Sequence, residues 1–386
     1  MTGSLKERAA AEVERLQPRL WEVAQAIHAR PEPLYEERFA AGLLAGELGV
    51  ETGAYGLETA FELRAGEGDG PTVAILLEYD ALPGIGHGCG HNLIAAAGLG
   101  AGLAAAAVVG EAGGRLRVLG TPAEEGGGGK IRLIEAGAFD GVDAAMMVHP
   151  AGLDLTEPDV IAIATWRVEY RGTGAHAAAA PERGRNALDA AVLGYNAVAA
   201  LRQHIAGDER VHGVFLKAGE KPNIVPDHTV AEWYVRSPTM ATLGPLKERV
   251  VACLEGGAAA AGCEMSLTST CPEYSHLRTN PPLADLYRRN SELLGRPVAE
   301  PTAHRKVTCS TDMGNVSLAV PSIHPLVAVA PPEVALHTAA FAEHARSAAG
   351  ARGVLDGARA MAMTAVDVWD RKGAAEAIRA AFRPET

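Results

Sequence analysis

The densest group of chemically reactive side chains lies in residues 78–92, which read EYDALPGIGHGCGHN. This stretch holds one thiol, two imidazoles and two carboxylates among glycines and a proline. Its glycines and proline exclude the interior of a helix or strand. An apolar run at residues 73–77 precedes it and an Ala-rich run from Asn92 follows, so we expect a loop between a buried strand and a helix. Open α/β sheets place their sites at such strand ends.

Two further apolar runs end in side chains of the same kind. Residues 115–120 read as a buried strand and are followed at once by Thr-Pro-Ala-Glu124-Glu125. The run at residues 144–148 ends in His149. Three successive strands with helices between them, each ending in metal-ligating or acid/base groups, predict a parallel sheet whose carboxyl edge carries a site.

Metal binding is the chemistry that this combination favours. Cys89 and His91 are two residues apart in a Gly-flanked turn, so both can face one ion. Thiolate, imidazole and carboxylate are ligands of zinc or a neighbouring transition metal, and Glu125 and His149 would complete the set. Cys89 could instead be a packed thiol and His91 a polar cap of the helix, but the convergence of three strand ends favours a metal centre.

The pair Glu124-Glu125 suits hydrolysis at such a centre. In an extended backbone adjacent side chains point in opposite directions, so one carboxylate can bind metal while the other faces the attacking water. That second carboxylate would take the proton of a metal-activated water and later protonate the leaving nitrogen. Asp80 either orients a metal ligand or only forms a turn.

Two other functions stay open at this point. Cys89 could be the nucleophile of a cysteine hydrolase with His87 or His91 as base, although that mechanism gives no role to Glu125 and His149. The chain could also be a metal-binding or small-molecule-binding protein that has the fold without turnover.

The order of elements indicates two kinds of domain in the 386 residues. Helices are expected at 4–30 and 36–48, and strand–helix alternation continues to about residue 164. Residues 165–274 change in texture and predict strand, helix, two strands, helix and strand, an inserted α+β domain. A second part of the first domain follows at 275–386, with helices at 283–294 and 341–380 around a loop-rich section.

Composition narrows the partners. The net charge of −12 argues against nucleic acid, and five unevenly spaced cysteines favour a reducing, cytoplasmic location over a disulfide framework. Residues 1–20 carry charges throughout, unlike a signal peptide. Residues 93–110 are uncharged but mostly Ala and Gly, so a buried helix is expected rather than a membrane span.

Six motifs occur in an order that resembles a known family. They are Glu78-x-Asp-Ala-Leu-Pro, His87-Gly-Cys-Gly-His-Asn, Thr121-Pro-Ala-Glu-Glu-Gly, Gly172-Thr-Gly-Ala-His, Asn223-Ile-Val-Pro and Ser310-Thr-Asp-Met-Gly-Asn. Over most of its length the chain resembles the metallo-amidohydrolases and carboxypeptidases that include aminoacylases, hippurate hydrolases and aminobenzoyl-glutamate hydrolases. It looks closest to the branch of aminobenzoyl-glutamate hydrolases and dipeptidases acting on unusual dipeptides.

The resemblance implies an α/β fold, with a mixed, mostly parallel sheet flanked by helices and an inserted α+β lid that also forms a homodimer. It implies two divalent metal ions, zinc or manganese, and Glu124 as the general base. The implied metal ligands are Cys89, His91, Glu125, His149 and His337. Spacing alone does not select His337 over His324 or His344. Many relatives carry a metal-binding His two residues before the Asp of the first loop, where this chain has Glu78.

In the lid, His176 resembles the residue that reaches the scissile carbonyl, often in the partner subunit's site, and an imidazole there could stabilise the oxyanion. Asn223 and Arg236 resemble the pair that holds the substrate, and a guanidinium suits a substrate carboxylate. The expected reaction is hydrolysis of a small N-acyl or N-aroyl amino acid, or of a dipeptide with a free carboxylate.

Overall fold

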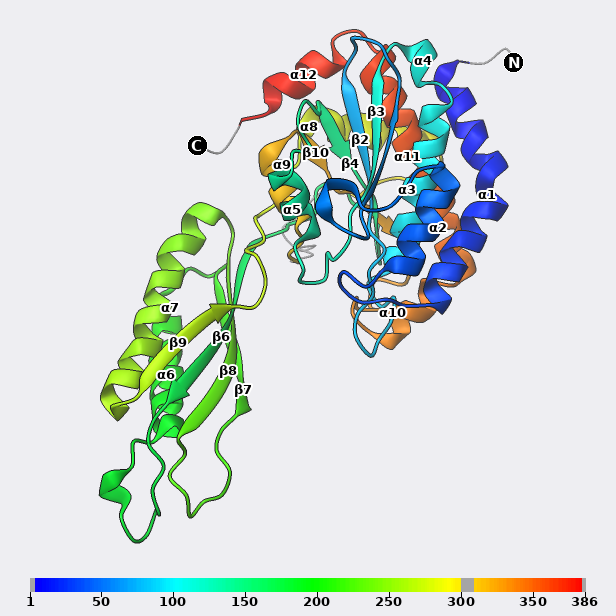
Figure 1. Cartoon of the computed structure of the whole chain (residues 1–386). Coiled ribbons are helices and arrows are strands. Elements are labelled where there is room, and N and C mark those ends of the chain that lie inside the picture. Colours follow the sequence, from blue (N-terminus) through cyan, green and yellow to red (C-terminus); the bar gives the residue numbers. More distant parts are fainter. Residues whose placement is uncertain (1–3, 300–308, 384–386) are drawn as a thin grey trace. The chain divides into compact units, whose positions relative to one another are not determined.

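The computed structural model describes residues 4–299 and 309–383. It divides into two compact units, one made of Met1–Asp159 with Leu277–Thr386 and the other of Val160–His276. The second unit is therefore inserted into the sequence of the first. Each unit is described by itself (Figure 1).

The first unit begins with helices α1 (Leu5–Ala29) and α2 (Arg38–Leu48). Its strands are β1 (Phe61–Ala65), β2 (Thr72–Leu77), β3 (Arg115–Gly120), β4 (Ala144–Met146), β5 (His149–Ala151), β10 (Ser322–Ile323) and β11 (Leu326–Ala328). Its remaining helices are α3 (His91–Ala106), α4 (Val109–Ala112), α5 (Gly129–Glu135), α8 (Pro281–Leu293), α9 (Met313–Ala319), α10 (Ala339–His344), α11 (Ala348–Asp370) and α12 (Ala374–Ala381).

A mostly parallel sheet with the strand order β1-β3-β2-β4-β10 forms the centre of this unit. β2 lies between β3 and β4 and is parallel to both, and β10 is parallel to β4. Only β1 is antiparallel to its neighbour within this sheet. The carboxyl ends of β2, β3 and β4 therefore lie at one edge, as expected from the three strand ends, and β5 pairs separately with β11 just beyond it.

Helix α3 packs close to the sheet because its residues are small. A Cβ on Gly98 would lie 2.7 Å from Leu77 of β2, and one on Gly102 would lie 2.7 Å from Val118 of β3. On the opposite side, a Cβ on Gly100 would lie 2.6 Å from Leu20 of α1. Among residues 4–299 and 309–383, no helix combines the length and apolar character needed to cross a bilayer. The uncharged run is thus a buried core helix.

The second unit is an antiparallel sheet with two long helices. Its elements are β6 (Ala162–Arg171), α6 (Ala187–Leu201), β7 (Arg210–Lys217), β8 (His228–Ser237), α7 (Met240–Ala261) and β9 (Glu264–Ser269). The strand order is β7-β8-β6-β9, so β7 and β9 are the edges. Val168, Trp233 and Leu254 belong to the separate hydrophobic core of this unit. In Figure 1 both helices lie along one side of this sheet.

The order of elements agrees with the sequence analysis, and the differences lie near the chain's end and next to the site. The single helix expected at 341–380 is three helices, α10, α11 and α12. The section expected to be loop-rich holds α9 as well as β10 and β11. His149 does not end β4, because two residues separate the strands and His149 begins β5.

Candidate metal centre

Asp80, three residues past β2, connects two of the expected metal ligands. Its Oδ1 lies 3.1 Å from Nδ1 of His91, and its Oδ2 accepts a hydrogen bond of 2.9 Å from the backbone N–H of Glu125. A carboxylate on Nδ1 leaves Nε2 of His91 to face an ion. Of the two roles considered for Asp80, the geometry favours orientation of a ligand.

The turn that carries Cys89 and His91 depends on the glycine between them. Gly90 has a φ of 81°, and a Cβ there would lie 2.6 Å from Cγ of Pro150. With this turn, Sγ of Cys89 lies 3.4 Å from Nε2 of His149, whose Nδ1 donates to the carbonyl of Pro150 at 2.8 Å. Sulfur and nitrogen ligands on one tetrahedral zinc ion are about 3.6 Å apart, so this pair fits one ion.

The backbone around Glu124 and Glu125 is a turn rather than the extended segment assumed from the sequence. Ala123 has a φ of 59°, and the turn brings both carboxylates to the same side. Glu124 Oε2 and Glu125 Oε1 each lie 3.8 Å from Nε2 of His91. Both residues thus face the same region, and opposite directions do not divide their roles.

His337 reaches this region from the loop before α10. Its backbone has a φ of 62° and its N–H donates to the carbonyl of Gly88 at 2.9 Å. Its Nε2 lies 3.6 Å from Oε2 of Glu125. Of the two competitors, His344 lies in α10, whereas His324 is buried with its ring centroid 5.4 Å from that of His149.

Three overlapping groups of side chains have their ligand atoms within 4.8 Å of one another. They are Cys89 with His91 and His149, Cys89 with Glu125 and His337, and Glu78 with His91 and Glu124. Five sequence-predicted metal ligands and the predicted base are thus close together. Glu78, which had no predicted role, lies among them.

The charges and polar atoms of this region fit bound cations. Five buried carboxylates meet here, from Glu78, Asp80, Glu124, Glu125 and Asp312. The ammonium of buried Lys130 pairs with Glu78 and Asp312 and offsets only part of this charge. Within the described residues, His91 Nε2, Glu78 Oε2 and Glu125 Oε1 are buried and have no hydrogen-bond partner. Buried charges and polar atoms of this kind require pairing or metal coordination.

The pKa shifts in the metal-free protein have the same origin. Burial, together with the charge of Glu125, raises the pKa of the Cys89 thiol well above its ordinary value. Burial and the charges of Glu78 and Glu125 do the same for the pKa of the Glu124 carboxyl. Burial lowers the pKa of His149 to about 4, so its imidazole is neutral and able to bind metal near neutral pH.

The geometry gives little support to a cysteine nucleophile. His87 faces away from Cys89, since its Nε2 lies 3.1 Å from the carbonyl of Ile27. Burial lowers the pKa of His87 to about 3 and raises the pKa of Cys89, which leaves a neutral thiol. A thiolate nucleophile needs the opposite shift.

The residues expected to bind substrate lie in the second unit. His176 is exposed, and its Nδ1 accepts from the backbone N–H groups of Ala178 and Ala179. Asn223 is next to it, because its carbonyl accepts from the N–H of Ala177 at 3.0 Å. Arg236 lies on β8, opposite Ile163 near the start of β6. The structure therefore brings His176 and Asn223 together but not Arg236.

Sequence reasoning missed Lys130 and Glu37. Lys130 lies one residue into α5 and is fully buried, although nothing in its local sequence separates it from a solvated lysine. Glu37 is buried and accepts a hydrogen bond from the N–H of Ala123, which precedes Glu124. The available signal for Glu37 was its place in the short polar segment between the first two helices.

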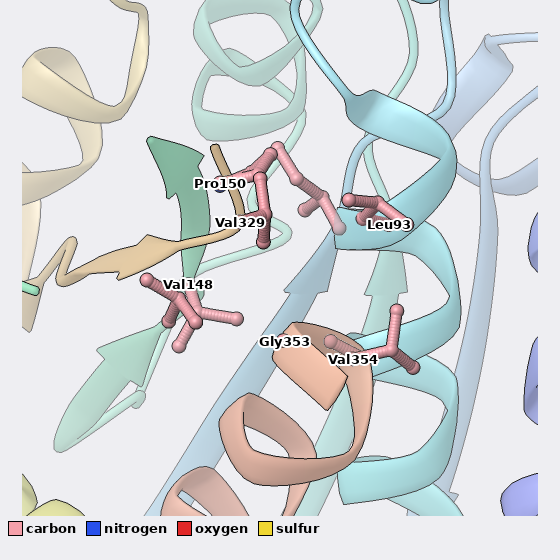
Figure 2. Close-up of a pocket in the computed structure, with 9 residues that line it drawn as sticks. Leu93, Val148, Pro150, Val329, Gly353 and Val354 are labelled. Atoms are coloured by element: carbon pink, nitrogen blue, oxygen red, sulfur yellow. The ribbon is translucent and has the colours of Figure 1, made fainter. Parts of the chain in front are cut away.

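An apolar pocket lies next to the metal centre (Figure 2). Leu93, two residues after His91, and Pro150, directly after His149, line it together with Val354 of α11. The other lining residues are Ile94, Ala97, Val148, Val327, Val329 and Gly353. None of these side chains is charged or hydrogen-bonding, so the pocket supports the ligand-bearing segments by packing.

Comparison with known proteins identifies relatives over nearly the whole chain. Residues 74–365 match the family model described as peptidase family M20/M25/M40. The Xaa-Arg dipeptidase of Mus musculus is 39% identical over 98% of this chain and 92% of its own length. One of the two p-aminobenzoyl-glutamate hydrolase polypeptides of Escherichia coli is 34% identical over 64% of this chain and 56% of its own length.

Solved structures of low sequence identity share the fold. A putative aminohydrolase from methicillin-resistant Staphylococcus aureus has a TM-score of 0.77 at 20% identity and covers 94% of this chain and 100% of its own. A structure described as a dinuclear metal binding peptidase from Bacillus subtilis has a TM-score of 0.70 at 20% identity, covering 92% of this chain and 99% of its own. Both confirm the α/β architecture expected from the sequence.

Proposed function

This chain belongs to peptidase family M20/M25/M40, and from this premise we propose that it hydrolyses a dipeptide with Glu124 as general base. The ligands of two divalent metal ions are, on this proposal, Cys89, His91, Glu125, His149 and His337. The observation that carries the proposal is the meeting of these six side chains, which come from four separate segments of the chain.

When bound, the ions would lower the pKa of a water molecule and polarise the scissile carbonyl. Glu124 then takes a proton from the attacking water at Oε2, which lies 3.8 Å from His91 Nε2. The same carboxyl group delivers that proton to the leaving nitrogen. Asp80 holds His91 and the backbone of Glu125 in place throughout.

The proposed substrate class is a dipeptide with a free carboxylate and a basic residue at its carboxyl end. The relatives with the widest coverage, from Mus musculus and Homo sapiens, are both described as Xaa-Arg dipeptidases. The net charge of −12 is consistent with this class, because a negative field attracts cationic substrates. An N-aroyl glutamate is the competing class, after the hydrolase from Escherichia coli.

In the second unit, the proposed lid, Arg236 and Asn223 would hold the substrate carboxylate and His176 would stabilise the oxyanion. Arg236 lies on β8 eight residues from His228, the strand end nearest His176. Eight residues of strand span about 26 Å. A dipeptide cannot bridge that distance, which supports a homodimer in which His176 completes the partner's site.

Zinc and manganese both suit a set of thiolate, imidazole and carboxylate ligands. The unpaired cysteines are consistent with a reducing, cytoplasmic location, which stays part of the proposal.

The test combines Glu124→Gln with a substrate panel. The variant should retain its metal and lose about 10²–10⁴-fold in kcat/KM, because a general base contributes that much. Glu58→Gln, at an exposed carboxylate paired with Arg38, is the matched control and should leave kcat/KM unchanged. The panel compares Ala-Arg, Ala-Lys, Ala-Glu and aminobenzoyl-glutamate at equal metal loading.

Three results would contradict parts of this proposal. Wild-type protein that binds metal but turns over no member of the panel would favour a binding protein. Full activity after complete chelation would favour the cysteine mechanism. Preference for aminobenzoyl-glutamate would replace the substrate class while leaving the metal chemistry intact.

A further inference from the structure

Glu78 is a fully buried carboxylate at the end of β2 whose two oxygens face different groups. Oε1 accepts from the ammonium of Lys130. Oε2 lies 3.5 Å from Nε2 of His91 and has no hydrogen-bond partner among the described residues. One oxygen of Glu78 is thus accounted for by an ion pair, and the other is not.

The unpaired oxygen points to a position where other ligand atoms converge. Glu78, His91 and Glu124 form one of the groups whose ligand atoms lie within 4.8 Å of one another. Nε2 of His91 is itself unpaired because Asp80 occupies Nδ1. Two ligands on one tetrahedral ion with bonds of about 2.1 Å are about 3.4 Å apart, close to the separation of Glu78 Oε2 and His91 Nε2.

Lys130 explains how Glu78 can be held ionised at this position. Its N–H and its ammonium both donate to Asp312, so the lysine is fixed at two points. Fixed in this way, it presents its charge to Oε1 of Glu78 and leaves Oε2 directed at His91. An ion pair alone would need only one of the two oxygens.

We propose that Glu78 is a direct ligand of the metal ion bound by His91, with Lys130 as its positioning residue. This inference rests on the proposed function, because it assumes that the chain binds two ions. It adds a carboxylate to the ligand set and makes the His91 side rich in oxygen, whereas Cys89 and His149 supply sulfur and nitrogen. Oxygen-rich sites favour Mn²⁺ over softer metals.

The first experiment compares Glu78→Gln with Asp312→Asn. Each variant removes one negative charge from the surroundings of Lys130, so a merely structural ion-pair role predicts that both bind metal alike. We expect Glu78→Gln to weaken Mn²⁺ binding at one of two sites by at least about tenfold in isothermal titration calorimetry. Asp312→Asn should keep both sites closer to wild-type affinity, and only Glu78→Gln should change the visible spectrum of the Co²⁺-loaded protein.

A second measurement needs no variant and keeps the proposal testable if Glu78→Gln does not fold. Anomalous diffraction from wild-type crystals soaked in Mn²⁺ should place an ion about 2.0–2.2 Å from Oε2 of Glu78. An ion bound by His91 but more than about 3 Å from that oxygen would overturn the assignment. Equal Mn²⁺ affinities and Co²⁺ spectra for the two variants would also overturn it. Absence of any bound ion in the wild-type protein would instead refute the hydrolase proposal.

Discussion

Glu37 shows how one buried carboxylate outside the metal centre can support it. Its Oε1 accepts from the backbone N–H groups of Tyr35 and Ala123, and its Oε2 accepts from the hydroxyl of Thr59. Tyr35 adds a second bond to the same loop, since its hydroxyl donates to the carbonyl of Gly127 at 2.6 Å. Together these bonds hold both ends of the turn that carries Glu124.

Ionising Glu37 costs stability. Burial, with a contribution from the charge of Asp80, raises its pKa from 4.5 to about 7. The folded state therefore binds more protons than the unfolded state between about pH 4.5 and 7, and the free energy of unfolding falls as pH rises through that range.

We expect Glu37→Gln to remove this fall. The amide keeps an oxygen for the two N–H groups and turns its NH₂ to Thr59. Relative to wild type, the variant should gain up to about 3 kcal/mol in free energy of unfolding between pH 4.5 and 8. Urea unfolding in EDTA at both pH values measures this without metal linkage.

Glu58→Gln is the control for that experiment. Arg38 lowers the pKa of Glu58, so its contribution to stability increases with pH, in the opposite direction to that of Glu37. If Glu37→Gln and wild type kept a constant difference in unfolding free energy from pH 4.5 to 8, the raised pKa of Glu37 would be wrong.

At the scale of single residues, motifs predicted more than geometry did. Cys89, His91, Glu125 and His149 could be chosen because their residue types are rare at three strand ends. The roles of Glu124 and Glu125 could not be separated by backbone direction, because the positive φ of Ala123 cannot be read from an alanine. Lys130 was invisible because its burial results from tertiary contacts with distant Glu78 and Asp312.

At the scale of elements, α3 sets how closely the helices approach the central sheet. Gly98, Gly100 and Gly102 lie where β2, α1 and β3 respectively leave no room for a side chain. The same helix begins at His91, so its distance from the sheet also sets the position of that ligand.

Gly98→Ala tests this close approach. The added Cβ would lie 2.7 Å from Cγ of Leu77 and 3.0 Å from the carbonyl oxygen of Leu76. Overpacking of this kind should lower the free energy of unfolding by about 1–3 kcal/mol in urea titration. Gly42→Ala in α2 is the matched control, because it is exposed and has no atom within 4 Å of its added Cβ. It should raise stability by about 0.5–1 kcal/mol, and equal effects would contradict the packing account.

Regular elements with clear periodicity were predictable, and breaks between helices were not. Residues 115–120 form β3 as expected, because six mainly apolar residues between a Gly pair and a polar turn favour a strand. The helix expected over 341–380 is broken instead by caps. Ser347 accepts from the N–H of Gly350 to start α11, and Gly373 with a φ of 81° separates α11 from α12. An isolated serine or glycine did not outweigh the Ala-rich pattern.

At the scale of the whole molecule, the second unit has the features of an interaction surface. β7 is an edge strand, and Val214, Phe215 and Leu216 on it are exposed apolar residues. Exposed edge strands with apolar side chains pair readily with another chain. This surface supports the proposed homodimer, and the position of His176 far along the sheet from Arg236 gives the dimer a catalytic purpose.

Subunit complementation tests whether His176 acts in the partner's site. His176→Ala and Glu124→Gln should each be nearly inactive as homodimers. His176 is exposed and its substitution removes no core contact, so the first variant should fold. In a mixed dimer, the protomer with an intact Glu124 receives His176 from its partner, so one of the two sites is complete. Unfolding and refolding the two chains together at equal amounts should restore about a quarter of the wild-type activity.

The recovered activity distinguishes the arrangements because only a shared site is restored by mixing. If His176 acted in its own protomer, the mixed dimer would combine one site lacking the imidazole with one lacking the base, and activity would stay at the level of the separate variants. Refolding each variant alone controls for changes caused by the procedure. Replacing Val214 and Leu216 with Glu should abolish the recovery if β7 forms the dimer, because buried like charges would oppose pairing of the two edges. Sedimentation analysis would then show monomers, whereas persistent dimers with recovered activity would place the interface elsewhere.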